Sequence, residues 1–186
     1  MKIKALIILI SIVAVSFIAV FALGRRGESV RGVRLLFPNG WVRSGVIEER
    51  VAPSFDAVFL KLAEQERENL EQKIIAGDEM PARLLRDNSI KVHVFEGERD
   101  ATEVLKDRVG TLAFSTVEPH TEKIGSSRVI VATHTEQKDP SKFAGGRDDF
   151  YIVTKSRKTI LLEYSTKSLD GRADLDGVIR WVIARL

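Results

Sequence analysis

Three histidines are the first candidates for chemistry in this chain of 186 residues: His93, His120 and His134. None belongs to an HExxH or HxH pattern, so no two of them have the spacing at which one helix or strand presents a zinc pair. His93 and His134 fall in segments that we expect to be strands, so a site would need the fold to bring them together. We interpret each histidine as a surface or rim residue and predict no metal site.

The sequence also lacks a motif that is typical of a catalytic serine. A serine hydrolase often carries its nucleophile in a GxSxG turn, and this pattern is absent; Gly125-Ser126-Ser127 is typical of a simple turn. The chain has no cysteine, which excludes disulfides, thiol nucleophiles and thiolate metal sites. It also has no Walker loop or dinucleotide glycine pattern. We therefore predict no catalytic and no cofactor-binding residue. A hydrolase whose active site is assembled only in the fold remains the alternative.

One short acidic motif resembles the interior of a calcium loop: Asp174-x-Asp176-Gly177. The EF-hand pattern would place its first and twelfth ligands at Arg172 and Ile183, which have the wrong chemistry. We expect Asp174 to cap the last helix and Asp176 to interact favourably with its dipole.

A second acidic pair is Asp148-Asp149, which follows the sequence Gly145-Gly146-Arg147. Paired carboxylates can act as acid and base or bind a cation, but adjacent residues of one loop rarely point into the same site. We expect this segment to be a solvated turn.

Trp41 and Trp181 are the candidate partner contacts. Tryptophan is enriched both in cores and at interfaces, because its ring is large and its indole N–H is polar. Trp181 lies beside the apolar stripe of the last predicted helix and not within it, so it either widens the buried face or contacts a partner.

The elements that position these residues begin with two strands. We expect a strand over 33–37, a turn at Pro38-Asn39-Gly40, and a second strand from Trp41 to Ile47 with a bend at Ser44-Gly45. A helix capped by Ser54 is then expected to run to Ala76, with Gly77 as its stop. A strand at 57–62 is the alternative for its first third.

The second half of the chain is richer in strand patterns. Strands are expected at 88–95, 111–117 and 128–135, with a short helix over 100–106. The segments 150–154 and 159–164, joined by residues 155–158, predict an antiparallel hairpin. The final helix presents its apolar residues with helical spacing and turns Arg180 and Arg185 away. Those apolar residues are Leu175, Val178, Ile179, Val182 and Leu186.

Because helices do not alternate regularly with strands, we predict an α+β domain with an antiparallel sheet covered by helices and not a parallel fold. The expected organisation is an anchor or signal peptide at 1–24, a linker at 25–32 and a single globular domain at 33–186.

The stretch 5–23 is the strongest signal of location, because its nineteen residues carry no charge. A helix of this length rises ~28 Å, and the hydrocarbon core of a bilayer is roughly 30 Å thick. Lys2, Lys4 and a weak cleavage site at Val20-Phe21-Ala22 also fit a secretory signal. The run is longer than a typical signal core and Arg25-Arg26 follow it at once, which favours an uncleaved transmembrane helix.

Charge argues against nucleic acid as a partner. Two of the 29 Lys and Arg precede the apolar run, which leaves 27 against 26 Asp and Glu. The densest basic cluster, Lys155, Arg157 and Lys158, falls in a predicted turn and is expected to be a solvated hairpin tip.

The segments FYIVTKSRKTILLEYSTKS (150–168) and DLDGVIRWVIARL (174–186) resemble the C-terminal end of PsbP-like domains, and LFPNGW (36–41) resembles their Pro-Gly-Trp start. The resemblance implies a small α+β sandwich in which a hairpin leads into a closing helix. It also implies a binding or assembly protein with no catalytic residues to carry over.

Together these features predict a non-enzymatic envelope protein, of accessory or immunity type, that binds another protein. We expect it to be held in the inner membrane by residues 5–23. The positive-inside rule leaves its orientation open, but the four-residue N-terminal tail is typical of signal-anchors and favours an extracytoplasmic domain.

Overall fold

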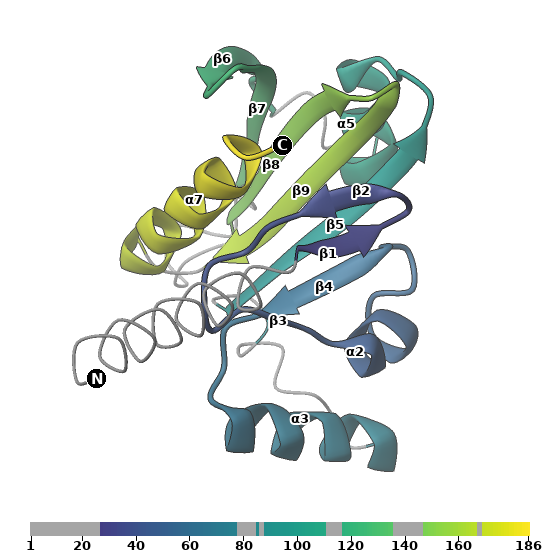
Figure 1. The fold of residues 1–186 in the computed structure, drawn as a ribbon, viewed down its shortest axis with the longest axis vertical. Coiled ribbons are helices and arrows are strands. Elements are labelled where there is room, and N and C mark those ends of the chain that lie inside the picture. The colour runs from purple at the N-terminus through teal and green to yellow at the C-terminus, as the bar shows by residue number, and fades with distance from the viewer. Residues whose placement is uncertain (1–26, 78–84, 86–87, 111–116, 136–146, 167–168) are drawn as a thin grey trace, which may run out of the picture.

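A seven-stranded antiparallel sheet forms the middle of the protein (Figure 1). The computed structural model describes residues 27–77, 85, 88–110, 117–135, 147–166 and 169–186. The strand order across the sheet is β3 (Val42–Arg43), β4 (Ala57–Leu60), β5 (Ser89–Glu96), β9 (Lys158–Thr166), β8 (Arg147–Lys155), β7 (Ser127–Thr135) and β6 (His120–Ile124). The α+β class and the antiparallel sheet are therefore confirmed.

The hairpin of β8 and β9 is the longest pairing in the sheet, and the sequence predicts its centre correctly. Its register runs from Arg147 opposite Thr166 to Lys155 opposite Lys158. Ser156 and Arg157, the two residues of the turn, both have positive φ, at 51° and 58°. This is the geometry of a two-residue hairpin turn whose twist matches that of the strands.

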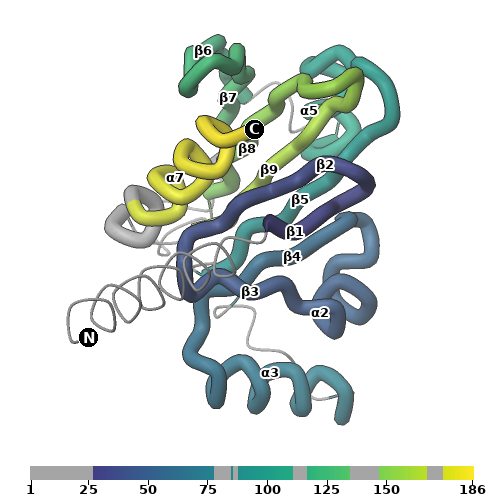
Figure 2. Tube along the Cα trace, viewed as in Figure 1, coloured from purple at the N-terminus to yellow at the C-terminus, as the bar shows by residue number. Residues whose placement is uncertain are grey.

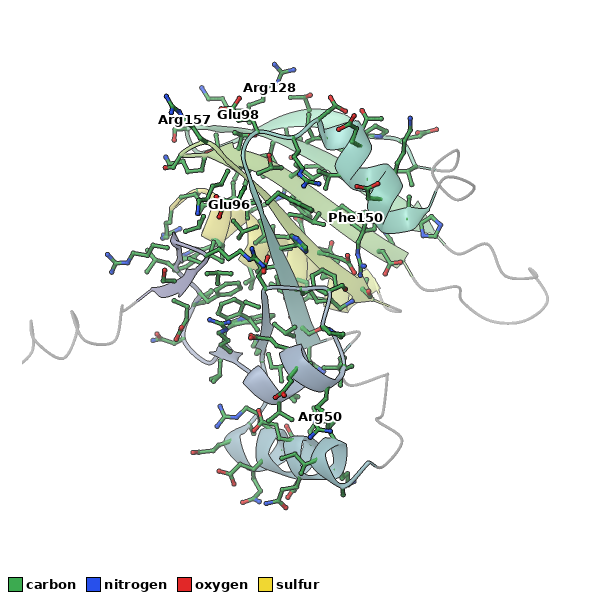
Figure 3. The ribbon with its side chains drawn as sticks, turned by 90° about the vertical axis from the view of Figure 1, so that its right-hand side faces the viewer. Arg50, Glu96, Glu98, Arg128, Phe150 and Arg157 are labelled. Carbon is green, nitrogen blue, oxygen red and sulfur yellow. The ribbon has the colours of Figure 1, made fainter. Side chains whose placement is uncertain are left out.

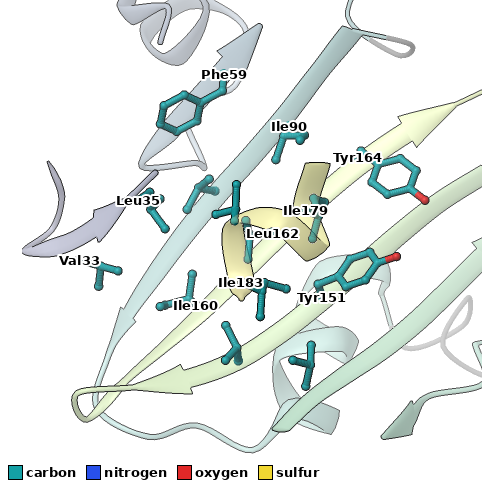
Figure 4. Packing of buried hydrophobic residues seen from close by; sticks show 14 of the residues in the cluster. Val33, Leu35, Phe59, Ile90, Tyr151, Ile160, Leu162, Tyr164, Ile179 and Ile183 are labelled. Atoms are coloured by element: carbon teal, nitrogen blue, oxygen red, sulfur yellow. The ribbon is translucent and has the colours of Figure 1, made fainter. Parts of the chain in front are cut away.

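One face of the sheet is covered by α7 (Leu169–Ile183) and by a hairpin of β1 (Glu28–Val30) and β2 (Val33–Leu35). Figures 1 and 2 show both on the same side of the sheet, with the hairpin between α7 and β4. In Figure 4, Ile179 and Ile183 of α7 lie over Ile160 and Leu162 of β9. Alternate residues of the central strands fill this core, as a sheet packed on both faces requires.

Among the elements that the structure describes, the opposite face carries α2 (Gly45–Arg50), α3 (Glu64–Ala76) and α5 (Ala101–Val109). Ile47 of α2 and Leu70 of α3 pack on β4, whereas Leu105 of α5 packs with Leu161 and Phe150 of the central strands. These are two separate apolar clusters on one face, and the space between them holds charged residues.

The predicted helix from Ser54 to Ala76 is wrong in its first third, where the alternative strand is present as β4. Val58 and Leu60 face α2 and α3, whereas Phe59 faces the side that the β1–β2 hairpin covers. The run is therefore apolar on both faces and has no periodicity that separates a strand from a helix. The helix begins at Glu64, with Ala63 and not Ser54 as its N-cap, whereas its run to Ala76 and its stop at Gly77, which adopts φ 82°, are confirmed.

Two further predictions near the N-terminal end of the domain are corrected. The expected strand from Trp41 to Ile47 is only the two residues of β3, because the side chain of Ser44 accepts a hydrogen bond from the Ile47 N–H and starts α2. Residues 28–32 of the expected linker form β1 and its turn, in which Arg31 and Gly32 have φ of 45° and 77°.

The last helix is also longer than expected. It begins at Leu169, so Asp174 lies inside it and does not cap it. Leu175, Ile179 and Val182 are buried as predicted.

Two predictions fall outside the described residues. The expected strand at 111–117 is described only at Val117, and the apolar stretch 5–23 is not described. Within the described ranges, no helix combines the length and apolar character that a membrane crossing requires.

Candidate functional site

A buried ion cluster separates the two apolar clusters beneath the helices. Glu163 of β9 is 3% exposed and accepts from Lys91 of β5 at 3.0 Å and from two nitrogens of Arg108 of α5. Both cations also lie against the ring of Phe55, with Arg108 4.3 Å from its centroid. Burial alone would raise the pKa of Glu163, but the Arg108 and Lys91 hydrogen bonds and charges outweigh it and lower that pKa. The buried carboxylate is fully paired with cations of the protein itself, which indicates a structural role.

A second polar network joins α7 to strands β6 and β8. Asp176 accepts from the Tyr151 hydroxyl and from Arg180 Nε at 2.8 Å, and Arg180 Nη1 donates to Glu122 at 2.6 Å. His120 Nε2 lies 2.8 Å from the other oxygen of Glu122. Hydrogen bonds from Arg180 and then from His120 lower the pKa of Glu122 to about 2.

This network corrects two predictions. Arg180 does not turn away from the domain, because it bridges α7 and β6. Asp176 does not lie in the first turn of the last helix, because α7 begins at Leu169, and both of its oxygens have partners in the protein.

The expected solvated turn around Asp148 and Asp149 is also corrected, because both residues belong to β8 and point to opposite faces. Asp149 is 1% exposed and is bound by Thr133 at 2.6 Å and by Arg147. The expectation that the two carboxylates do not share a site is confirmed.

Ser165, Asp148 and His134 are adjacent in register on three neighbouring strands, and these are the residue types of a hydrolase triad. Their order is wrong for that chemistry, since a triad needs histidine between serine and acid. Here Asp148 is the central residue, and His134 lies two strand spacings from Ser165, about 9–10 Å. The His134 Nδ1 atom is 3.7 Å from Asp148.

The three histidines are not brought together. His93 Nδ1 lies 2.7 Å from the carbonyl of Ser54, and its ring stacks on Phe95 at 4.1 Å. In the part of the chain that the structure describes, no group of three or more His, Asp or Glu is placed to hold a metal ion.

Trp41 lies in an open pocket beside β3, the edge strand of the sheet. The ring of Phe37 stacks on Phe59, and the Trp41 ring lies 5.9 Å from that of Phe37. Phe59 is buried, whereas Trp41 and Phe37 are half-buried and Val42 is 39% exposed. This Trp41 pocket has a volume of about 390 Å³ and is lined by Glu28, Leu35, Phe37, Pro38, Asn39, Gly40, Trp41, Val42, Arg43 and Phe59.

Arg43 gives the Trp41 pocket a fixed polar rim. It donates to both carboxylate oxygens of Glu48, at 2.8 and 2.9 Å, and to the carbonyl of Asp56 at 3.0 Å. The hydrogen bond to Glu48 is the main reason that the pKa of Arg43 is raised. Since these bonds hold Arg43 in place, the pocket is largely formed before any partner arrives.

Trp181 lies elsewhere, on α7 itself, where it is half-buried and packs against the core. The guanidinium of Arg185 covers its ring at 3.8 Å and donates to its carbonyl at 3.0 Å. Arg185 in turn lines a second pocket with Arg34, Lys155 and Lys158. Trp41 lines the first pocket, whereas Trp181 lines neither of the two and contacts Arg185, which lines the second. The sequence does not reveal that Arg34 and Arg185 join Lys155 and Lys158 around the second pocket.

No protein-family model matches the sequence, and no curated protein matches it at a significant level. The structure is similar to the solution structure of cyanobacterial PsbP (CyanoP) from Synechocystis sp. PCC 6803, with 17% sequence identity and a TM-score of 0.49. The match covers 86% of this chain and 88% of that chain. That solved protein is a PsbP, the family whose domains the LFPNGW segment and the last hairpin and helix resemble. The likeness concerns the fold, so the function of this chain is argued from its own residues.

Proposed function

We propose that this chain is a non-catalytic accessory domain that binds another protein through the Trp41 pocket. The observation that carries the proposal is the aromatic floor of that pocket at the open edge of the sheet. Among the described residues no strand pairs with the outer side of β3, so a partner chain can approach both the edge and the pocket. Tryptophan beside a preformed hollow is typical of the residues that dominate binding energy at interfaces.

The hydrolase alternative receives no support from the two pockets described, because neither is lined by a histidine. The buried carboxylates Glu163 and Asp149 lie against cations of the protein itself. Binding therefore accounts better for the accessible features than acid–base catalysis does.

We also propose that residues 5–23 hold the domain at the inner membrane and that the domain lies outside the cytoplasm. The uncharged stretch of nineteen residues supports the anchor. A reporter that is active only outside the cytoplasm, fused after Leu186, tests the orientation. Activity supports the proposal, and activity only of a cytoplasmic reporter contradicts it.

The binding proposal is tested by capture of partners from solubilised membranes on the full chain. Trp41→Ala should reduce recovery of a specific partner at least tenfold, because the anchor of the pocket is removed. Ile75→Ala is the matched control, since Ile75 is 61% exposed on α3, away from the pocket. Equal recovery by Trp41→Ala and wild type would contradict the proposed site.

A further inference from the structure

We propose that the second pocket binds a phosphate ester with an apolar arm. Its volume is about 560 Å³, within the range typical of small-molecule sites. It lies between β2, the β8–β9 turn and the end of α7, and is lined by Gly32, Val33, Arg34, Leu36, Lys155, Ser156, Lys158, Arg185 and Leu186. We call it the basic pocket.

The charge of the basic pocket points to an anion. Four of its lining side chains are cationic and none of the lining side chains is acidic. Arg34 lies on β2, Lys155 and Lys158 flank the β8–β9 turn, and Arg185 follows α7. The fold therefore assembles a cluster that no single segment of the sequence contains. Four cations around one opening exceed what a single carboxylate pairs with, whereas phosphate oxygens suit several Arg and Lys donors at once.

The four cationic side chains differ in whether they already pair with a carboxylate of the protein. Lys158 is already held, since its ammonium donates to the carbonyl of Arg31 and to Glu96 at 3.0 Å. Within the described residues, no ion pair joins Arg34, Lys155 or Arg185 to a carboxylate, and all three side chains are exposed. In Figure 3, Arg157 and Glu98 lie at the same end of the molecule, but neither lines the pocket.

The apolar lining residues are the reason that we expect the ligand to carry an apolar arm. Val33 is buried in the core, and Leu36 and Leu186 are half-buried beside the cationic side chains. A ligand that fills this space gains from burying apolar surface as well as from its charge. An anionic phospholipid and a soluble phosphate ester share this chemistry. The lipid source rests on the anchor proposed above, whereas the pocket itself is independent of the Trp41 proposal.

The stacked pair of Arg185 and Trp181 supplies a direct readout. The chain has two tryptophans, so Trp41→Phe leaves Trp181 as the single emitter. Because Arg185 covers the Trp181 ring at 3.8 Å, an anion that draws its guanidinium away should change the emission.

The experiment uses the full-length Trp41→Phe chain in a non-ionic detergent that carries no phosphate, at constant ionic strength. Four probes are titrated: inorganic phosphate, glycerol 3-phosphate, dihexanoyl phosphatidylglycerol and dihexanoyl phosphatidylcholine. We expect a saturable change in emission with phosphatidylglycerol, at a Kd at least tenfold below that for glycerol 3-phosphate, and little change with phosphatidylcholine. Equal affinity for glycerol 3-phosphate would overturn the apolar arm.

Charge reversal within the pocket provides the second arm of the test. Arg34→Glu with Lys155→Glu should raise the Kd at least tenfold, since both side chains are exposed and their replacement leaves the core intact. Lys73→Glu with Lys61→Glu is the matched control, because these residues are exposed outside the pocket. A pocket variant that binds like the control, or emission that changes with no probe, would overturn the proposal.

Discussion

The ring of Phe37 lies nearly parallel to that of Phe59, with 3.9 Å between centroids and 18° between planes. Phe59 belongs to β4 and is buried, whereas Phe37 lies in the segment that follows β2 and is half-buried. The stack therefore ties the β1–β2 hairpin to the edge of the large sheet and forms the floor of the Trp41 pocket.

Removing either ring of this stack should lower the free energy of unfolding, and the loss should be larger for the more buried ring. Phe59→Ala is expected to destabilise the full chain by about 3–5 kcal/mol, because a buried aromatic ring is replaced by a cavity. Phe37→Ala should cost less, since its ring already reaches solvent. Urea unfolding measures both, and a larger loss for Phe37→Ala would contradict the described packing.

The buried ion cluster makes a different prediction. Glu163→Gln keeps the shape of the side chain but leaves Arg108 and Lys91 without their anion. We expect a loss of about 1–3 kcal/mol, because both cations reach solvent and are only partly stranded. Glu68→Gln, at an exposed position of α3, is the control and should be close to neutral. A shift in urea midpoint equal to that of the control would show that the cluster contributes nothing.

The low pKa of Glu122 predicts how stability depends on pH. Its pKa of about 2 in the folded chain lies below its usual 4.5, so the stabilisation is complete above pH 4.5 and is lost as pH falls toward 2. Glu122→Gln removes this pH-dependent contribution to stability. The difference in unfolding free energy between wild type and variant should therefore shrink across that window. A difference that is constant with pH would contradict the Arg180–Glu122 bridge.

The β8–β9 turn offers a stabilising substitution. Arg157 has φ 58°, a conformation that costs most residues roughly 1 kcal/mol and glycine little. Arg157→Gly should raise the thermal midpoint, whereas Arg157→Ala, which retains a Cβ atom, should not. If both variants behave alike, the change reflects the lost side chain and not the turn geometry.

Local patterns predicted much of the fold, because they depend on neighbours in the sequence. The hairpin around Ser156-Arg157, the stop at Gly77 and the buried stripe through Leu175 and Ile179 are of this kind. Burial of β4 on both faces removes the alternation typical of a strand, so the sequence favours a helix there with a strand as the alternative.

The site was harder to predict, because its residues meet across long stretches of sequence. Trp41 could be selected by residue type, but its pocket depends on Phe59, which comes from another element. The second pocket depends on Arg34 and Arg185, which are far apart in the sequence. Arg180 looked solvent-facing on its own helix, and only the position of β6 gives it Glu122 as a partner. No sequence spacing carries that information.

The most direct test of partner binding is photo-crosslinking in intact cells from Val42, which is exposed at 39% on the edge strand and lines the Trp41 pocket. A photoreactive phenylalanine analogue at Val42 should give one discrete adduct with another protein, and the same analogue at Ile75 should not. The Val42 adduct should also disappear when Trp41 is replaced by Ala. No adduct at Val42, or the same adducts from both positions, would contradict binding at this pocket.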